Sequence, residues 1–183
     1  MRMACPSVNI TIRRVTGTTK TCSGIAFGSE VSGGISNVHV EDIHVFNSSY
    51  GLRLKTAPGR GGYITNITIV NITLTHIKHA IVFTGDAGEH PPPLPLNSYF
   101  APHNFSLVNN IVIRNCIGFH IKSPGRFWSI PESPFQNICL FNISLDVASP
   151  SWSCSHAFGS SYLVSPQLCP TLKNSSSSES CYS

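Results

Sequence analysis

Apolar and polar residues alternate in short segments that recur along the chain. Each segment begins with Asn, alternates apolar and variable positions, and carries a second Asn or Asp five residues later. Four full copies and a weaker first copy have this pattern: Asn9–Val15, Asn37–Ile43, Asn66–Ile72, Asn110–Cys116 and Asn137–Ile143. The first copy is weaker because Arg14 stands where the others have the second Asn or Asp. Alternation with a period of two predicts a half-buried strand in each copy.

The spacing of the copies predicts a solenoid. Their starts are 28, 29, 44 and 27 residues apart, and the longest step contains an insertion. A period in this range is typical of repeats that pack only against their neighbours. A second apolar run begins 14 or 15 residues after each of the first three starts, at 24–28, 51–55 and 80–84. We expect the second Asn or Asp of each copy at a corner, because such side chains bond to local backbone in tight bends.

These features predict an all-β fold, a right-handed single-stranded parallel β-helix of about five coils with a disulfide-containing C-terminal tail. An antiparallel β-sandwich is the alternative, but it requires hairpin turns such as Asn-Gly, which the sequence lacks. Cys116 stands where the other copies have Val or Ile, so we expect a small buried apolar side chain there.

Two regions follow from the pattern. We expect β-helix coils over 1–148, interrupted by an insertion at 86–103 that is too rich in proline to form a strand. Residues 149–183 are expected to form a Cys-rich cap and a flexible Ser-rich tail. The insertion is equally consistent with a wall for a substrate channel and with a surface loop of no particular role.

Composition narrows the classes of function. The chain has 183 residues, enough for one sizeable core, with 11% charged residues and a net charge of +4. This charge gives a mild preference for an acidic partner. The basic residues are scattered without interleaved aromatics, so a nucleic-acid partner is not expected. No apolar run reaches the roughly 18 residues of a membrane span, so no membrane partner is expected either.

Seven cysteines indicate an oxidising compartment. Three of them, Cys154, Cys169 and Cys181, lie within the last thirty residues, where disulfides commonly close the end of a secreted domain. The odd number leaves at least one cysteine without a partner in the chain. No Cys-x-x-Cys pair or matching histidine spacing supports a metal site, so neither a metal nor a cofactor is predicted.

Seven Asn-x-Ser/Thr sequons point in the same direction. Several belong to the repeat itself and serve equally well as corner residues. Asn47, Asn104 and Asn174 lie outside the repeat copies and are the better glycosylation candidates. The chain has no apolar leader after Met1, and its first strand begins without a polar cap. We therefore expect the C-terminal part of a longer, secreted cell-wall protein.

Arg53 and Lys55 are the candidate binding residues. They alternate with leucines, so both cations leave the core on one face, about 7 Å apart at ~3.3 Å per residue. Their expected neighbours in adjacent coils include the small Ala26 and Val82, which leave room for a ligand above the sheet. Arg offers a planar fork suited to a carboxylate, and Lys a mobile charge. Exposed cations on a strand are also commonly no more than a solvated surface.

The residues around these cations resemble a known family. The segment 28–35 reads Gly-Ser-Glu-Val-Ser-Gly-Gly-Ile, and Arg53-Leu54-Lys55-Thr56 is followed at 59–63 by Gly-Arg-Gly-Gly-Tyr. In this respect the chain resembles the pectin-degrading polygalacturonases of glycoside hydrolase family 28, especially the plant branch. The likeness extends over essentially the whole chain, through Pro134-Phe135 to Trp152-x-Cys154.

The resemblance implies a parallel β-helix and a substrate, polygalacturonate, whose carboxylates contact Arg53 and Lys55. It also implies inverting hydrolysis, in which one carboxyl protonates the leaving oxygen and others activate a water. The family's Asn-Thr-Asp motif and Asp-Asp pair are absent here. No catalytic residue is therefore assigned, and we expect this chain alone to be inactive. The acidic residues near the expected groove segments form no pair on the Arg53 sheet: Glu30, Glu41, Asp42 and Asp86.

Two positions depart from the family pattern. Ser23 stands where the family's Gly-His-Gly motif has its histidine, a change that is common in the plant branch. His79 aligns with a tyrosine that contacts substrate in many members, so we name it as a third candidate substrate-binding residue. A lone exposed histidine is, however, more often without a function.

Three functions remain in view. The first is a polygalacturonase-like glycoside hydrolase that acts on pectin, here without its catalytic aspartates. The second is a non-catalytic pectin-binding module that uses the same groove. The third is a structural solenoid, which would require a regular outward array of threonines. Thr11 and Thr68 share a position in the repeat, but His39, Val112 and Cys139 interrupt the array. Endo or exo action, substrate methylation and oligomeric state are left open.

Overall fold

A computed structural model of the chain describes residues 5–29, 33–87 and 105–174. These residues form β-strands and the turns between them, and none of them lies in an α-helix. In the described part of the chain, no helix has the length and hydrophobicity of a membrane span. The strands are β1 (Ser7–Thr18), β2 (Ser23–Phe27), β3 (Ile35–Lys55), β4 (Tyr63–Thr84), β5 (Leu107–Ile121), β6 (Ser123–Trp128), β7 (Phe135–Val147), β8 (Ser153–Ser155), β9 (Ala157–Ser165) and β10 (Leu172–Asn174).

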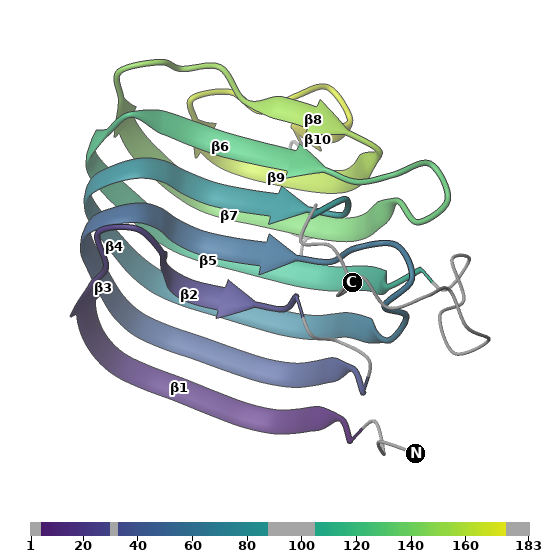
Figure 1. Cartoon of the computed structure of the whole chain (residues 1–183). Helices are drawn as coiled ribbons and strands as arrows, with labels where there is room; N and C mark the ends of the chain where they lie inside the picture. The colour runs from purple at the N-terminus through teal and green to yellow at the C-terminus, as the bar shows by residue number, and fades with distance from the viewer. Residues whose placement is uncertain (1–4, 30–32, 88–104, 175–183) are drawn as a thin grey trace.

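The strands stack into a right-handed parallel β-helix, as the sequence predicts (Figure 1). One series runs β1-β3-β4-β5-β7-β9-β10, and every ladder between these strands is parallel. This parallel pairing excludes the β-sandwich. The long strands β3 and β4 bend round the coil without interruption, so the second and third predicted pairs of short strands are each one continuous strand. The first predicted pair forms the separate strands β1 and β2.

The far ends of β3 and β4 belong to a second side of the coil. There β2 pairs with β3, β6 pairs with β4, and β8 pairs with β6, all in parallel. We call this side the groove sheet, and a set of residues paired across successive coils a column. The groove sheet consists of residues 23–27, 50–55, 79–84, 123–128 and 153–155.

The asparagines of the repeat form the corners of the coils. Asp42 and Asn71, at the second position of their copies, have φ of 56° and 58°, as expected for a bend. Asn37 and Asn66, at the first position, have φ of 55° as well, which the sequence pattern did not indicate. Asn and Asp adopt this left-handed conformation more readily than other residues with a side chain. Both fixed positions of the repeat are therefore backbone requirements.

The corner side chains also bond to one another from coil to coil. In the first column, the Asn66 Nδ2 donates to the Asn37 Oδ1 at 3.1 Å, and the Asn110 Nδ2 donates to the Asn66 Oδ1 at 2.8 Å. In the second column, Asn115 donates to Asn71 at 3.2 Å and accepts from Asn142 at 2.9 Å. Each amide thus satisfies its neighbour, which explains why the residue type repeats.

A third corner lies beyond the part of the repeat that is recognisable in sequence. Asn47, His76 and His120 have φ between 47° and 55°, and the rings of His76 and His120 stack with centroids 4.8 Å apart. The sequon asparagine at 47 is thus an exposed corner residue too. Asn104 lies outside the described residues, and Asn174 is the last residue of β10.

The core lies inside the coils and is filled by branched aliphatic side chains. Ile67, Ile69 and Ile72 of one copy are each 1% exposed, and their counterparts in the neighbouring coils are similarly buried. Cys116 is 2% exposed and carries a free thiol, so the prediction of a small buried apolar side chain is confirmed. Burial raises the pKa of this thiol to about 12, so it stays protonated.

The two ends of the described solenoid differ. At the C-terminal end, Trp152 and Leu172 pack against the core, and a disulfide joins Cys154 to Cys169. The predicted disulfide in this region is thus confirmed, and Cys139 is disulfide-bonded as well. At the other end, Val8, Ile10 and Val15 of β1 are exposed. Most of the expected insertion at 86–103, and residues 175–183 of the expected tail, lie outside the described residues.

Candidate functional site

Arg53 belongs to a column of five residues on the groove sheet. The column runs Ala26, Arg53, Val82, Arg126 and Ser153. Leu52 and Leu54 on either side of Arg53 are buried at 1% and 0% exposure, so the guanidinium leaves the core as the alternation predicts. The small neighbours predicted for Arg53 are in place. The structure adds a second arginine, Arg126, two coils away.

Both arginines rest on aromatic rings. The Arg53 Cζ lies 4.3 Å from the ring centroid of Tyr50, and the Arg126 Cζ lies 4.9 Å from that of Trp128. These distances are within the range of cation–π attraction, which fixes a guanidinium in orientation. The Nε atoms of both arginines are buried and have no hydrogen-bond partner among the described residues. Both guanidiniums are thus oriented, and a ligand would meet their terminal nitrogens rather than the buried Nε.

Lys55 belongs to the adjacent outward column. This column contains Lys55, Thr84, Trp128 and Ser155. Lys55 is half-buried at the end of β3, two residues after Arg53 on the same face. The structure therefore places the two predicted cations on one face, and Trp128 lies two coils further along the Lys55 column.

His79 lies in a third column, Ser23, Tyr50, His79 and Ser123. The His79 Nδ1 and the Ser123 Oγ are 2.8 Å apart, and the Tyr50 and His79 rings stack with centroids at 5.4 Å. Burial lowers the pKa of His79, and the charges of Arg126, Lys122 and Lys78 lower it further. The imidazole is consequently neutral near pH 7. Ser23 occupies the same column but is separated from His79 by Tyr50.

A cavity of about 300 Å³ connects these columns, and no carboxylate is among its lining residues. Its lining consists of Tyr50, His79, Val82, Ser123, Gly125, Arg126, Trp128, Ser151 and Ser153. Elsewhere, Glu41 pairs with Arg13 at 3.0 Å, and Asp42 takes part in a corner column. Asp86 is exposed just after β4. Glu30 lies outside the described residues.

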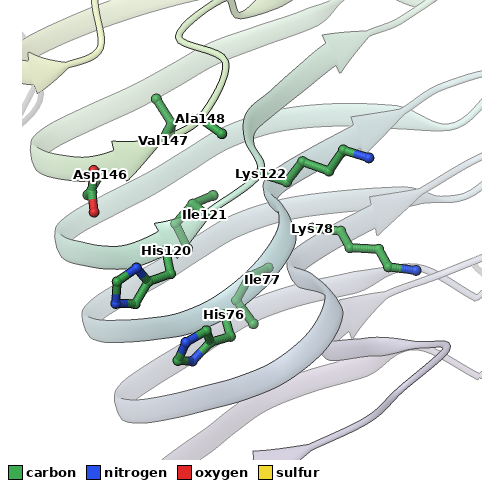
Figure 2. Close-up of a pocket in the computed structure, with 9 residues that line it drawn as sticks. All are labelled: His76, Ile77, Lys78, His120, Ile121, Lys122, Asp146, Val147 and Ala148. Atoms are coloured by element: carbon green, nitrogen blue, oxygen red, sulfur yellow. The ribbon is translucent and has the colours of Figure 1, made fainter.

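A larger hollow of about 500 Å³ lies at the third corner (Figure 2). His76 and His120 point outward from the bend, whereas Lys78 and Lys122 point to its other side. Asp146 lies in the coil above His120. Lys78 directly precedes His79, and Lys122 directly precedes Ser123, so both add positive charge beside the groove sheet. In the described part of the chain, no three side chains are grouped so as to hold a metal ion.

The model of one protein family, described as glycosyl hydrolases family 28, matches residues 3–157. The chain belongs to glycosyl hydrolases family 28. A probable polygalacturonase of Vitis vinifera is 34% identical over 91% of this chain and 34% of its own length. Polygalacturonase-2 of Solanum lycopersicum is 28% identical over 77% of this chain and 32% of its own length.

The fold of this family 28 chain also has a counterpart among solved structures. The crystal structure of a hyperthermoactive exopolygalacturonase from Thermotoga maritima matches with a TM-score of 0.71 at 21% identity. The match covers 87% of this chain and 34% of that one. The family 28 chain therefore spans about a third of the length of these relatives.

Sequence reasoning missed three residues of the groove: Tyr50, Arg126 and Trp128. A signal for the last two was present in the spacing. Arg53 stands 16 residues after the first Asn of its copy (53 minus 37), and so does Arg126 (126 minus 110). This offset predicts a shared column. Tyr50 had no such signal, because its column holds no second tyrosine: the other members are Ser23, His79 and Ser123.

Proposed function

We propose that the groove sheet binds the carboxylates of polygalacturonate, and that the chain carries the substrate-binding side of a polygalacturonase-like glycoside hydrolase. Arg53 and Lys55 are the main carboxylate ligands in this proposal, and His79 is a neutral contact for sugar hydroxyls. The observation that carries it is the oriented Arg53 guanidinium, which rests on Tyr50 with its Nε unpaired. The polygalacturonase names of the family 28 relatives support the choice of anion.

By itself, this chain is proposed to bind pectin without hydrolysing it. Inverting hydrolysis requires two carboxyl groups roughly 6.5–9.5 Å apart on opposite sides of the scissile bond. The lining of the described cavity includes no carboxylate. Binding alone does not stabilise a proton-transfer transition state, so no enzymatic rate is expected. This observation also favours the second candidate function, a pectin-binding module.

The test is equilibrium binding of polygalacturonate by calorimetry at low ionic strength, combined with an assay for released reducing ends. Arg53→Ala should weaken binding at least about tenfold, because a hydrogen bond to a charged group contributes about 1.5–3 kcal/mol. Arg13→Ala is the matched control, since it removes the same charge from a different face. Fully methyl-esterified pectin should bind weakly to every variant.

Each outcome has a definite meaning. Equal losses of affinity for polygalacturonate in Arg53→Ala and Arg13→Ala would show that the binding is nonspecific charge attraction. Release of reducing ends in proportion to folded protein would overturn the proposed lack of activity, and a carboxylate such as Asp86 would then need a catalytic role.

We further propose secretion to the cell wall, where this substrate class occurs. The disulfide between Cys154 and Cys169 supports an oxidising compartment, and the exposed Asn47 is the first candidate for a glycan. Mass spectrometry of the protein isolated from its source should find a hexosamine-containing modification at Asn47. Unmodified Asn47 throughout would remove this support.

A further inference from the structure

The groove contains the same arrangement of arginine and aromatic ring twice. Arg53 lies over Tyr50, and Arg126 lies over Trp128. The two arginines share a column, with only Val82 between them. Since neighbouring strands lie about 4.8 Å apart, the backbones of the two arginines are about 9.6 Å apart along the solenoid axis.

The second arrangement is held as firmly as the first. The Trp128 Nε1 donates to the Ser153 Oγ at 2.7 Å, which fixes the ring beneath the guanidinium. The preceding residue, Gly125, has φ of 126°, and a Cβ there would lie 1.7 Å from the Ile81 carbonyl oxygen. The backbone is thus drawn close to β4 just before Arg126. Such preorganisation lowers the entropic cost of binding.

The charges around Arg126 leave room for an anion. Its Nε is buried without a hydrogen-bond partner, and it forms no ion pair with any described residue. Arg126 and Trp128 line the described cavity together with Val82, whereas Arg53 lies in the next coil beyond Val82 and is not among the lining residues. Two like charges on one column repel each other, so anionic groups bound at both would relieve the repulsion.

We propose that Arg126, supported by Trp128, is a second carboxylate-binding subsite, so that the groove holds an oligouronate chain laid along the solenoid axis. The proposal rests on the proposed function and extends it from one carboxylate to two. One uronate carboxylate binds at Arg53 and Lys55, another binds at Arg126, and the sugar between them lies over Val82. His79 contacts the same chain from the side.

The test is a series of dissociation constants for galacturonate oligomers of increasing length. In the unmodified chain, affinity should rise steeply at the first length that spans both arginines. Arg126→Ala should abolish this rise and weaken long oligomers about tenfold or more, while the shortest oligomers that bind keep nearly the same affinity at Arg53. Arg126→Lys, which keeps the charge without the planar fork, should give an intermediate loss.

Controls separate this proposal from the one on which it rests. Arg13→Ala should leave the length dependence unchanged, and circular dichroism with unfolding midpoints checks that every variant is folded. If Arg126→Ala does not fold, the Arg126→Lys series decides. A length dependence that survives substitution of Arg126, while Arg53→Ala weakens binding, would overturn the second subsite alone. No binding of any oligomer by the unmodified chain would overturn the proposed function as well.

Discussion

The corner columns and the groove columns are built from the same stacking but use it in opposite ways. At the corners, asparagine stands on asparagine, and each amide donates to the one in the neighbouring coil. In the groove sheet, the residue changes from coil to coil, and two arginine Nε atoms are left without partners. In a repeated column each side chain bonds to its column neighbour, whereas in an irregular column the arginines have no matching neighbour of that kind. Repetition therefore indicates structure here, and irregularity indicates binding.

The largest loss of stability is expected from a substitution in the groove sheet at Gly125, where the backbone of β6 lies close to that of β4. Gly125→Ala would place a Cβ 1.7 Å from the Ile81 carbonyl oxygen at a φ that side chains avoid. We expect a loss of about 3 kcal/mol or more in the free energy of unfolding, together with loss of oligouronate binding. Urea unfolding measures the first quantity and calorimetry the second.

Gly17→Ala is the matched control, because no atom lies within 4 Å of its Cβ position. Its stability should change by at most about 1 kcal/mol. Similar losses at Gly17 and Gly125 would show that the close approach of β6 to β4 does not matter.

A corner substitution should have the next largest effect. Asn115→Ala removes two amide contacts and places alanine at φ of 55°. We expect a loss of about 2 kcal/mol, of which roughly half comes from the backbone conformation. Asn115→Gly should recover that half, because glycine tolerates the left-handed region. Oligouronate binding by the folded variants should be unchanged. Weakened binding would contradict the view that the corner columns serve structure and the groove columns serve binding.

The pH dependence of stability offers a finer probe. The folded pKa of His79 lies below its unfolded value of 6.5, so between the two values the unfolded chain binds more protons. Stability from this group is therefore complete above about pH 6.5 and is lost as the pH falls toward the folded pKa. His79→Gln should remove this weak dependence in unfolding measurements. Arg126→Ala should raise the pKa of His79, as followed by NMR of the imidazole, whereas Arg13→Ala should not.

The smallest expected effect is itself informative. Arg53→Ala should lower the free energy of unfolding by no more than about 1 kcal/mol, because loss of the cation–π contact with Tyr50 is partly offset by removal of one of two like charges on a column. Thermal unfolding at low ionic strength measures this. A loss as large as that of Asn115→Ala would make Arg53 a structural residue and undermine its role in binding.

The fold could be predicted from the sequence because the corners demand particular residues. Asparagine at Asn66 and Asn71 satisfies both a left-handed φ and a bond to the next coil, so the requirement remains visible as a repeat. The third corner was not visible, because Asn47 and His76 meet the same backbone demand with different residue types. The covalent partner of Cys154 was not predictable either, since several pairings fit the spacing.

The candidate site was only partly predictable for a related reason. Arg53 and Lys55 follow from alternation along one strand, which is a local property. The contacts of Tyr50 with Arg53 and of Trp128 with Arg126 join residues through ring orientation, which spacing along the chain does not encode. The hydrogen bond between His79 and Ser123 spans 44 residues and crosses the insertion. Irregular columns leave no repeat from which to infer them.

The two ends of the described solenoid differ in how well they are covered, so resistance to local unfolding should increase from β1 toward the C-terminal coils. Each coil is stabilised by its neighbours, so a coil covered on one side only is the first to open. Val8, Ile10 and Val15 are exposed at the β1 end, whereas Trp152, Leu172 and a disulfide close the other. Wherever no further coil covers β1, opening is expected to begin there and to advance coil by coil. The amides of β4, protected on both sides, would exchange with solvent long after those of β1. The coil that carries Arg126 would stay folded after the coil that carries Arg53 has opened.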